Sequence, residues 1–156
     1  MRVPELVSKL PGVGTTIFTV MSRLAEECGA INLSQGFPDY QPPAALLDRV
    51  THHLHAGHNQ YPHMTGIAEL REQIAEKVVR LYGVRPDATS EVTVTSGATE
   101  ALFCAIHAVV RPGDEVIVFD PAYDSYEPAV TLAGAKTIHI PLLLPECNID
   151  WERFAL

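Results

Sequence analysis

The stretch Ser96-Gly97-Ala98-Thr99-Glu100 lies between two runs with different hydrophobic periods. Residues 91–95 alternate between polar and apolar, which predicts a β-strand, and residues 101–106 are apolar at helical spacing, which predicts a helix. The first N–H groups of a helix lack partners within it and lie at the positive end of its dipole. Gly97 and Ala98 leave room beside these groups, and Ser96 and Thr99 add hydroxyls. Two interpretations follow: a phosphate-binding turn, or an ordinary strand-to-helix turn with a capping serine.

Strands and helices alternate on both sides of this turn. Residues 1–15 predict an irregular arm, and Thr16 predicts the start of the first helix. We expect helices over 17–28, 42–56, 66–81, 98–110, 125–133 and from 151, and strands over 30–33, 91–95, 115–119 and 136–140. This order predicts an α/β fold with a parallel sheet, right-handed crossovers and helices on both faces. Because only three strands form the parallel unit and the last helix stops after barely two turns, we expect the chain to be the front part of a larger protein.

Composition narrows the class of partner. The formal charge is −8, with 11 Lys and Arg in total, which argues against nucleic acid and anionic membranes as partners. A hydrophobic content of 47% with 19% charged residues is typical of a globular chain. Cys28, Cys104 and Cys147 are scattered, which suits a reducing cytoplasm, and we expect neither a signal peptide nor a membrane span.

A histidine-rich segment offers a competing interpretation. His52, His53, His55 and His58 lie close together, and helical spacing places His52 and His55 on one face. No cysteine or carboxylate completes a ligand set within this segment. We therefore favour a solvated helix end and expect no metal site.

Four motifs in a fixed order resemble a known family. They are Asn32-Leu33-Ser34-Gln35-Gly36-Phe37-Pro38-Asp39, the segment 60–66 (QYPHMTG) followed by Leu70-Arg71, the segment 96–102 (SGATEAL), and the segment 119–128 (FDPAYDSYEP). Together they resemble the N-terminal part of the class I/II aminotransferases, which are pyridoxal-phosphate enzymes of the aspartate aminotransferase fold. The chain is most similar to the methionine and kynurenine aminotransferase group, from about residue 10 to its end. The resemblance implies that residues 1–30 are an arm and helix of the small domain and that 31–156 are a truncated cofactor-binding large domain.

The resemblance also implies which residues bind the cofactor, pyridoxal 5'-phosphate. Gly97, Ala98 and Thr99 would hold its phosphate through backbone N–H groups and the threonine hydroxyl. Tyr123 would stack on the pyridine ring, at the carboxyl end of the predicted strand 115–119. Tyr61 would reach the cofactor phosphate of the neighbouring subunit in a homodimer, although a partly buried loop tyrosine is the commoner use of this residue.

Two further residues would contact the substrate. Gly36 would offer its backbone N–H to the substrate carboxylate; a glycine needed only for the turn is the alternative. Phe18 would line the pocket for the substrate side chain, where simple core packing is the alternative. We expect no arginine close to Phe18 that would pair with a second substrate carboxylate.

The Schiff-base lysine of this chemistry is missing. Lys9, Lys77 and Lys136 are the only lysines, and none lies in a Ser-x-x-Lys context. We therefore expect no catalytic residue in this chain and no activity of the 156 residues alone. The resemblance implies that the full-length parent transfers an amino group from a large hydrophobic or aromatic amino acid, such as methionine, to a 2-oxo acid. A C–S lyase of the same fold and a non-catalytic fragment are the alternatives.

Overall fold

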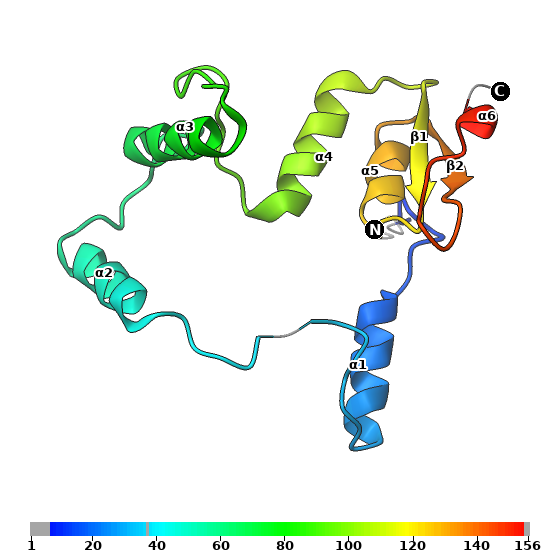
Figure 1. Cartoon of the computed structure of the whole chain (residues 1–156), viewed down its shortest axis with the longest axis horizontal. Helices are drawn as coiled ribbons and strands as arrows, with labels where there is room; N and C mark the ends of the chain where they lie inside the picture. Colours follow the sequence, from blue (N-terminus) through cyan, green and yellow to red (C-terminus); the bar gives the residue numbers. More distant parts are fainter. Residues whose placement is uncertain (1–6, 37, 155–156) are drawn as a thin grey trace, which may run out of the picture. The chain divides into compact units, whose positions relative to one another are not determined.

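The computed structural model describes residues 7–36 and 38–154. The first six residues of the predicted arm, Phe37 of the first motif and the last two residues lie outside this range. Figure 1 shows the elements, which are α1 (Ile17–Glu27), α2 (Ala44–His55), α3 (Ala68–Tyr82), α4 (Gly97–Val109), β1 (Glu115–Asp120), α5 (Tyr126–Leu132), β2 (Lys136–Pro141) and α6 (Trp151–Phe154).

The chain divides into two compact units. The first unit joins residues 1–35 to residues 97–156, and the second comprises residues 36–96. This division reflects contacts within the chain and does not test the predicted domains, so the division into 1–30 and 31–156 stays a prediction.

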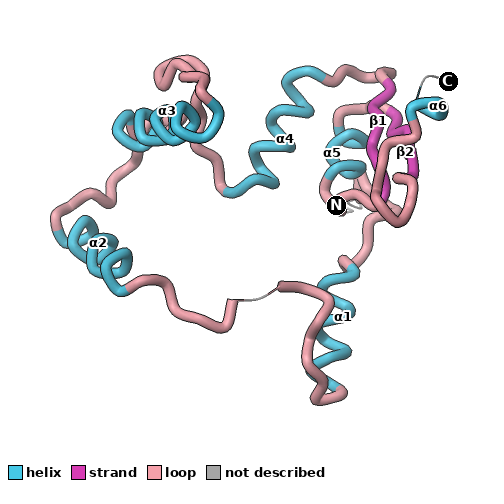
Figure 2. The backbone as a smooth tube through the Cα atoms, viewed as in Figure 1, coloured by secondary structure: helices cyan, strands magenta, loops and turns pink. Residues whose placement is uncertain are grey.

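A parallel strand pair with its crossover helix forms the centre of the first unit. Residues Glu115–Asp120 pair in register with Lys136–Pro141, and α5 connects the two strands (Figure 2). The predicted α/β class with parallel pairing is therefore confirmed. Four side chains form the buried core here, two from α5 and one from each strand: Val118, Ala129, Val130 and Ile140.

The helix boundaries follow from local chemistry that the sequence shows. The side-chain oxygen of Thr16 accepts a hydrogen bond from the Thr19 N–H at 3.3 Å, which caps α1. Gly83 ends α3 in a left-handed conformation with φ 74°, which costs glycine little. The Asp150 carboxylate accepts a bond from the Arg153 N–H at 3.0 Å at the start of α6, the helix predicted from residue 151.

Two predicted strands are wrong. Residues 91–95 form no ladder; the Val94 N–H donates to the Thr65 carbonyl at 3.0 Å, in a loop of the same unit. The alternation there reflects one-sided burial of Val92 without a strand partner. Residues 30–33 also lie outside any strand, because the Asn32 side chain accepts bonds from the backbone and hydroxyl of Ser34, and such local bonds compete with strand pairing.

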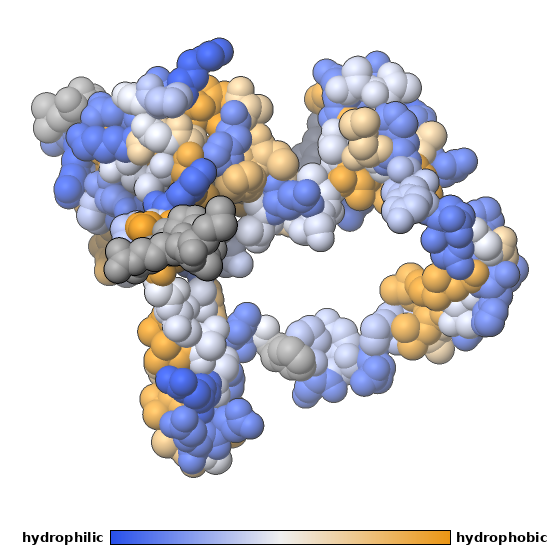
Figure 3. Space-filling view, turned by 180° about the vertical axis from the view of Figure 1, so that it is seen from behind, coloured by the Kyte–Doolittle hydropathy of each residue, from blue (hydrophilic) through white to orange (hydrophobic). Residues whose placement is uncertain are grey.

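Much of the apolar surface is exposed. Figure 3 shows hydrophobic residues at the surface of the molecule, and Ile31, Leu33 and Met64 are each at least 86% exposed. Within the described ranges, the structure contains no helix that is both long and apolar enough to cross a membrane.

Candidate functional site

An open pocket of about 650 Å³ lies between the polar side of α1 and the first residues of α4 in the first unit. Its volume lies within the range of small-molecule sites in proteins. Four segments line it, namely α1 with its cap, the segment between α1 and α2, the first turn of α4, and the loop between β1 and α5. The lining residues are Thr16, Phe18, Thr19, Ser22, Arg23, Glu26, Gln35, Thr99, Tyr123, Asp124 and Ser125.

The pocket brings together three residues to which the resemblance gave roles in binding. Phe18 comes from α1, Thr99 from the first turn of α4, and Tyr123 from the loop after β1. Gly97 and Ala98 begin α4 beside Thr99. Gly36 and Tyr61 belong to the second compact unit, and their roles stay predictions.

The turn into α4 leaves space for a bound group. Gly97 has a φ of 83°, in the left-handed region, and a Cβ built there would have no atom within 4 Å beyond its chain neighbours. The Oγ of Ser125, on the same pocket, is buried without a hydrogen-bond partner among the described residues. The hydroxyls of Thr99 and Ser125 are donors of the kind that bind a phosphate ester, and the glycine leaves side-chain space beside them, so these residues fit pyridoxal phosphate.

The charged residues of the pocket include an arginine. Arg23, on the same helix as Phe18, lines the pocket, and the expectation that no arginine near Phe18 in sequence pairs with a second substrate carboxylate stays a prediction. The Arg23 Nε lies 3.7 Å from a carboxylate oxygen of Glu27, one helical turn away, and both side chains are mostly exposed. Such a pair is weak and leaves the guanidinium free to reorient. Glu26 and Asp124 also line the pocket, so the charged side chains of its lining sum to a negative charge.

Sequence reasoning missed several lining residues. Ser22, Arg23 and Glu26 lie one or two helical turns after Phe18 or Thr19, and residues at i+4 share a helix face. That spacing could have predicted that these residues lie on the same helix face as Phe18 or Thr19. Gln35 and Ser125 stand within the resembling motifs, but only the tertiary structure places them at the same pocket.

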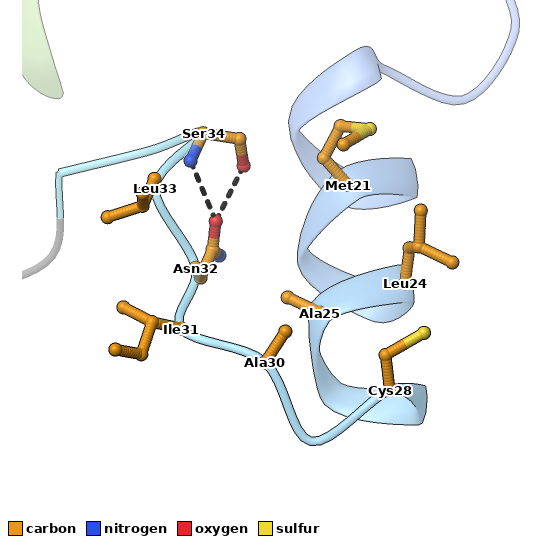
Figure 4. A pocket seen from close by; sticks show the side chains of 9 residues that line it. All are labelled: Met21, Leu24, Ala25, Cys28, Ala30, Ile31, Asn32, Leu33 and Ser34. Atoms are coloured by element: carbon orange, nitrogen blue, oxygen red, sulfur yellow. Dashed lines mark hydrogen bonds between the residues drawn. The ribbon is translucent and has the colours of Figure 1, made fainter.

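The opposite side of α1 is apolar. A pocket of about 340 Å³ lies between α1 and residues 30–34, and its side chains are shown in Figure 4. Met21, Leu24 and Cys28 supply its helix side. The side-chain oxygen of Asn32 accepts a hydrogen bond from the Ser34 N–H (Figure 4), and its side-chain NH₂ donates to the Ser22 hydroxyl at 2.9 Å. This pocket therefore offers apolar contact and no cluster of free polar groups for chemistry.

The remaining candidates contribute no chemistry to the pocket. Lys9, Lys77 and Lys136 all lie within the described residues, and none of them lines it. Lys136 instead pairs with Glu115 at 3.0 Å. Across residues 7–36 and 38–154, no group of three or more His, Cys, Asp or Glu side chains is arranged to hold a metal ion.

Comparison with protein families gives one match over most of the chain. Residues 29–155 match the model of aminotransferase class I and II. A methionine aminotransferase of Escherichia coli is 58% identical over 148 residues, which is 95% of this chain and 38% of the relative. A human kynurenine–oxoglutarate transaminase is 35% identical over 86% of this chain and 30% of the relative.

The fold agrees with a solved structure of the same kind. An E. coli protein with a reported methionine aminotransferase function superimposes with a TM-score of 0.91, at 56% identity, over 99% of this chain and 40% of that chain. The aminotransferase fold expected from the motifs is thereby confirmed. This chain spans less than half the length of each relative compared.

Proposed function

Because this chain belongs to the class I and II aminotransferases, we propose that it is the front, cofactor-binding part of a pyridoxal-phosphate-dependent transaminase. The reaction moves an amino group from a large hydrophobic or aromatic amino acid, with methionine as the leading donor, to a 2-oxo acid. The observation that carries the proposal is the shared pocket of Phe18, Thr99 and Tyr123. The identity to a methionine aminotransferase over 95% of the chain supports it.

The residues of the pocket have separate tasks in this proposal. Thr99 donates its hydroxyl to the cofactor phosphate, and the backbone N–H groups of Gly97 and Ala98 face the same anion at the positive end of α4. The aromatic face of Tyr123 holds the pyridine ring. When bound, pyridoxal phosphate supplies an electron sink for bond cleavage at the amino acid's α-carbon.

Two positions contact the substrate, and a third contacts the cofactor of a second subunit. Phe18 covers an apolar side chain and excludes water from it. Gly36 donates its backbone N–H to the substrate carboxylate. Tyr61, whose side chain is fully exposed, donates its hydroxyl to the cofactor phosphate of a second subunit in a homodimer.

The nucleophile comes from outside these 156 residues. The full-length protein supplies the lysine that binds the cofactor covalently and that moves the proton at the α-carbon. The chain by itself should therefore show no transamination. We propose a cytoplasmic location, for which the three cysteines, all free thiols in the structure, give support.

A hybrid enzyme tests the proposal. Residues 1–156 are joined to the part of the E. coli methionine aminotransferase that follows the matched region, and transamination is assayed. Thr99→Ala should weaken cofactor binding about tenfold, the loss of one hydrogen bond to a charged group. Thr51→Ala, an exposed threonine on α2, is the matched control and should leave the affinity unchanged. Equal affinity in Thr99→Ala and the control would remove the phosphate role.

A donor series tests the substrate class. Methionine and phenylalanine should exceed aspartate in kcat/KM, because Phe18 gives apolar contact and the lining of the pocket is net negative. Phe18→Ala should reduce this preference by roughly tenfold. Release of thiol and ammonia when no 2-oxo acid is added as acceptor would favour the C–S lyase. An inactive hybrid that binds no cofactor would favour a non-catalytic fragment.

A further inference from the structure

His139 lies between the two ends of the loop that supplies Tyr123, Asp124 and Ser125 to the pocket. Residues 121–125 connect β1 to α5, and Tyr123, Asp124 and Ser125 from this loop line the pocket. Asp120 ends β1 immediately before the loop, and Glu127 stands in the first turn of α5 immediately after it. A side chain that contacts both Asp120 and Glu127 therefore holds the two ends of the loop together.

The geometry of His139 meets this condition. Its Nδ1–H donates to the Asp120 carboxylate, at 3.0 Å and 3.1 Å from the two oxygens. Its Nε2 lies 3.8 Å from a carboxylate oxygen of Glu127. A carboxylate only accepts hydrogen bonds, so the Nδ1 nitrogen carries a proton in this arrangement.

We propose that His139 is a positioning residue, which in its doubly protonated form clamps the two ends of the 121–125 loop and so orients Tyr123 in the pocket. In the neutral ring the Nε2 lone pair faces the Glu127 carboxylate, which is unfavourable. In the protonated ring Nδ1 still donates to Asp120, and the positive charge attracts the Glu127 carboxylate, 3.8 Å from Nε2, so that both ends of the loop are held. The part of this proposal that concerns ligand binding rests on the proposed function.

The surrounding charges favour the protonated form. The charged groups that face His139 are Asp120 from β1 and Glu127 from α5. The hydrogen bond that His139 donates to Asp120 raises the pKa of His139 above its ordinary value. Desolvation opposes the shift, and the charges of Asp120 and Glu127 add to it. The clamp is therefore closed at mildly acidic pH and opens as the pH rises through this pKa.

The same strand pair offers a matched control. At the other end of the ladder, Lys136 of β2 bonds to Glu115 of β1 at 3.0 Å, and these side chains are 70% and 62% exposed. This pair joins the same two strands, and it involves neither end of the loop. Removing it tests whether any β1–β2 ion pair has the same effect.

The experiment is amide hydrogen exchange on the whole chain at about pH 6 and about pH 8.5, on either side of the ordinary histidine pKa. Rates are corrected for the chemical pH dependence of exchange. In the wild type, protection of residues 123–127 should fall about threefold at the higher pH, the scale of a partly exposed ion pair. His139→Gln, which donates but carries no charge, should remove this pH dependence, whereas Lys136→Gln should retain it.

A second variant and a ligand complete the test. Glu127→Gln removes one end of the clamp at an exposed position and should reduce the pH dependence without abolishing it. Binding of 4'-deoxypyridoxine 5'-phosphate, which forms no imine, should be about threefold weaker in His139→Gln than in the wild type at about pH 6 and equal at about pH 8.5.

The outcomes separate the clamp from the function. The clamp is overturned if the pH dependence of exchange at residues 123–127 is unchanged in His139→Gln. It is also overturned if Lys136→Gln loses this pH dependence as fully as His139→Gln does. If the wild type binds no analogue while the exchange pattern appears as expected, the clamp stands and the cofactor site of the proposed function fails.

Discussion

The two compact units of this chain are held together by different means. The first unit contains the β1–β2 ladder, with pairing between residues about 21 positions apart and a buried cluster around Val130. In the described part of the second unit, residues 36 and 38–96, two helices and irregular segments occur without a strand. Its buried side chains are Ala75 and Val92. The difference teaches that the pocket stands on a unit with a strand ladder, while the second unit depends on individual close contacts between its helices and loops.

The closest of these fits is at Gly66, and breaking it should have the largest effect. Gly66 has φ 97°, and a Cβ built there would lie 2.6 Å from the Val94 Cγ2. Gly66→Ala should destabilise the second unit by about 3 kcal/mol, from overpacking together with the left-handed backbone. Faster hydrogen exchange of the α3 amides in Gly66→Ala than in the wild type would measure this loss of stability.

Gly83 is the matched control for Gly66. It has φ 74° with nothing within 4 Å of a built Cβ, so Gly83→Ala should cost only about 1 kcal/mol. Equal costs at both glycines would show that the contact with Val94 does not constrain the unit.

The first unit should respond next most strongly, through its core. Val130 is fully buried, and Val130→Ala should cost about 2 kcal/mol from lost burial and a small cavity. Val109→Ala, at a side chain that is 74% exposed in the same unit, should stay within about 0.5 kcal/mol. Denaturant unfolding measures both, and a similar cost for the two valines would contradict the assignment of this core.

Helix capping gives a smaller contrast. The hydroxyl of Thr16 caps α1 in the first unit, whereas α2 and α3 begin at residues without a side-chain cap bond. Thr16→Ala should cost about 1 kcal/mol and expose the first-turn amides of α1 to exchange. Thr16→Ser keeps the hydroxyl and should restore protection; if it exchanges as fast as Thr16→Ala, the cap contributes nothing.

The pH response should be the smallest effect and should differ in sign between the units. In the second unit, bonds from the Thr89 hydroxyl and backbone, and then from Ser90, lower the pKa of Asp87 to about 2, below its ordinary 3.8. Its contribution is present above about pH 3.8 and is lost as the pH falls towards 2. In the first unit, the raised pKa of His139 gives a contribution that is present below about 6.5 and lost as the pH rises above it.

Unit-resolved hydrogen exchange across pH measures this contrast. Asp87→Asn should remove the acid sensitivity of residues 87–91 and leave the first unit unchanged. Asp48→Asn, on α2 of the same unit, is the control and should retain it. Acid sensitivity that survives Asp87→Asn would mean that another group is responsible.

Local signals in the sequence predicted most elements but misplaced two strands. Thr16, Gly83 and Asp150 mark helix ends, because capping depends on neighbours within a few residues. A strand depends on a partner distant in sequence, and alternation in 91–95 therefore did not establish one. Part of the pocket was predicted: the resemblance gave roles to Phe18, Thr99 and Tyr123, but it gave none to their neighbours Arg23 and Ser125.

The sequence by itself determined the family, the α/β class and the absence of a lysine in the required context, because each depends only on residue identity and spacing. The tertiary structure alone decided that Phe18 shares a pocket with Thr99 and Tyr123 and that His139 reaches both Asp120 and Glu127. These contacts join residues from separate helices, strands and loops. For His139, the parallel pairing of β1 with β2 and the crossover through α5 bring the three side chains together. No period or motif along the chain encodes that geometry, since it arises only when β1, α5 and β2 pack together.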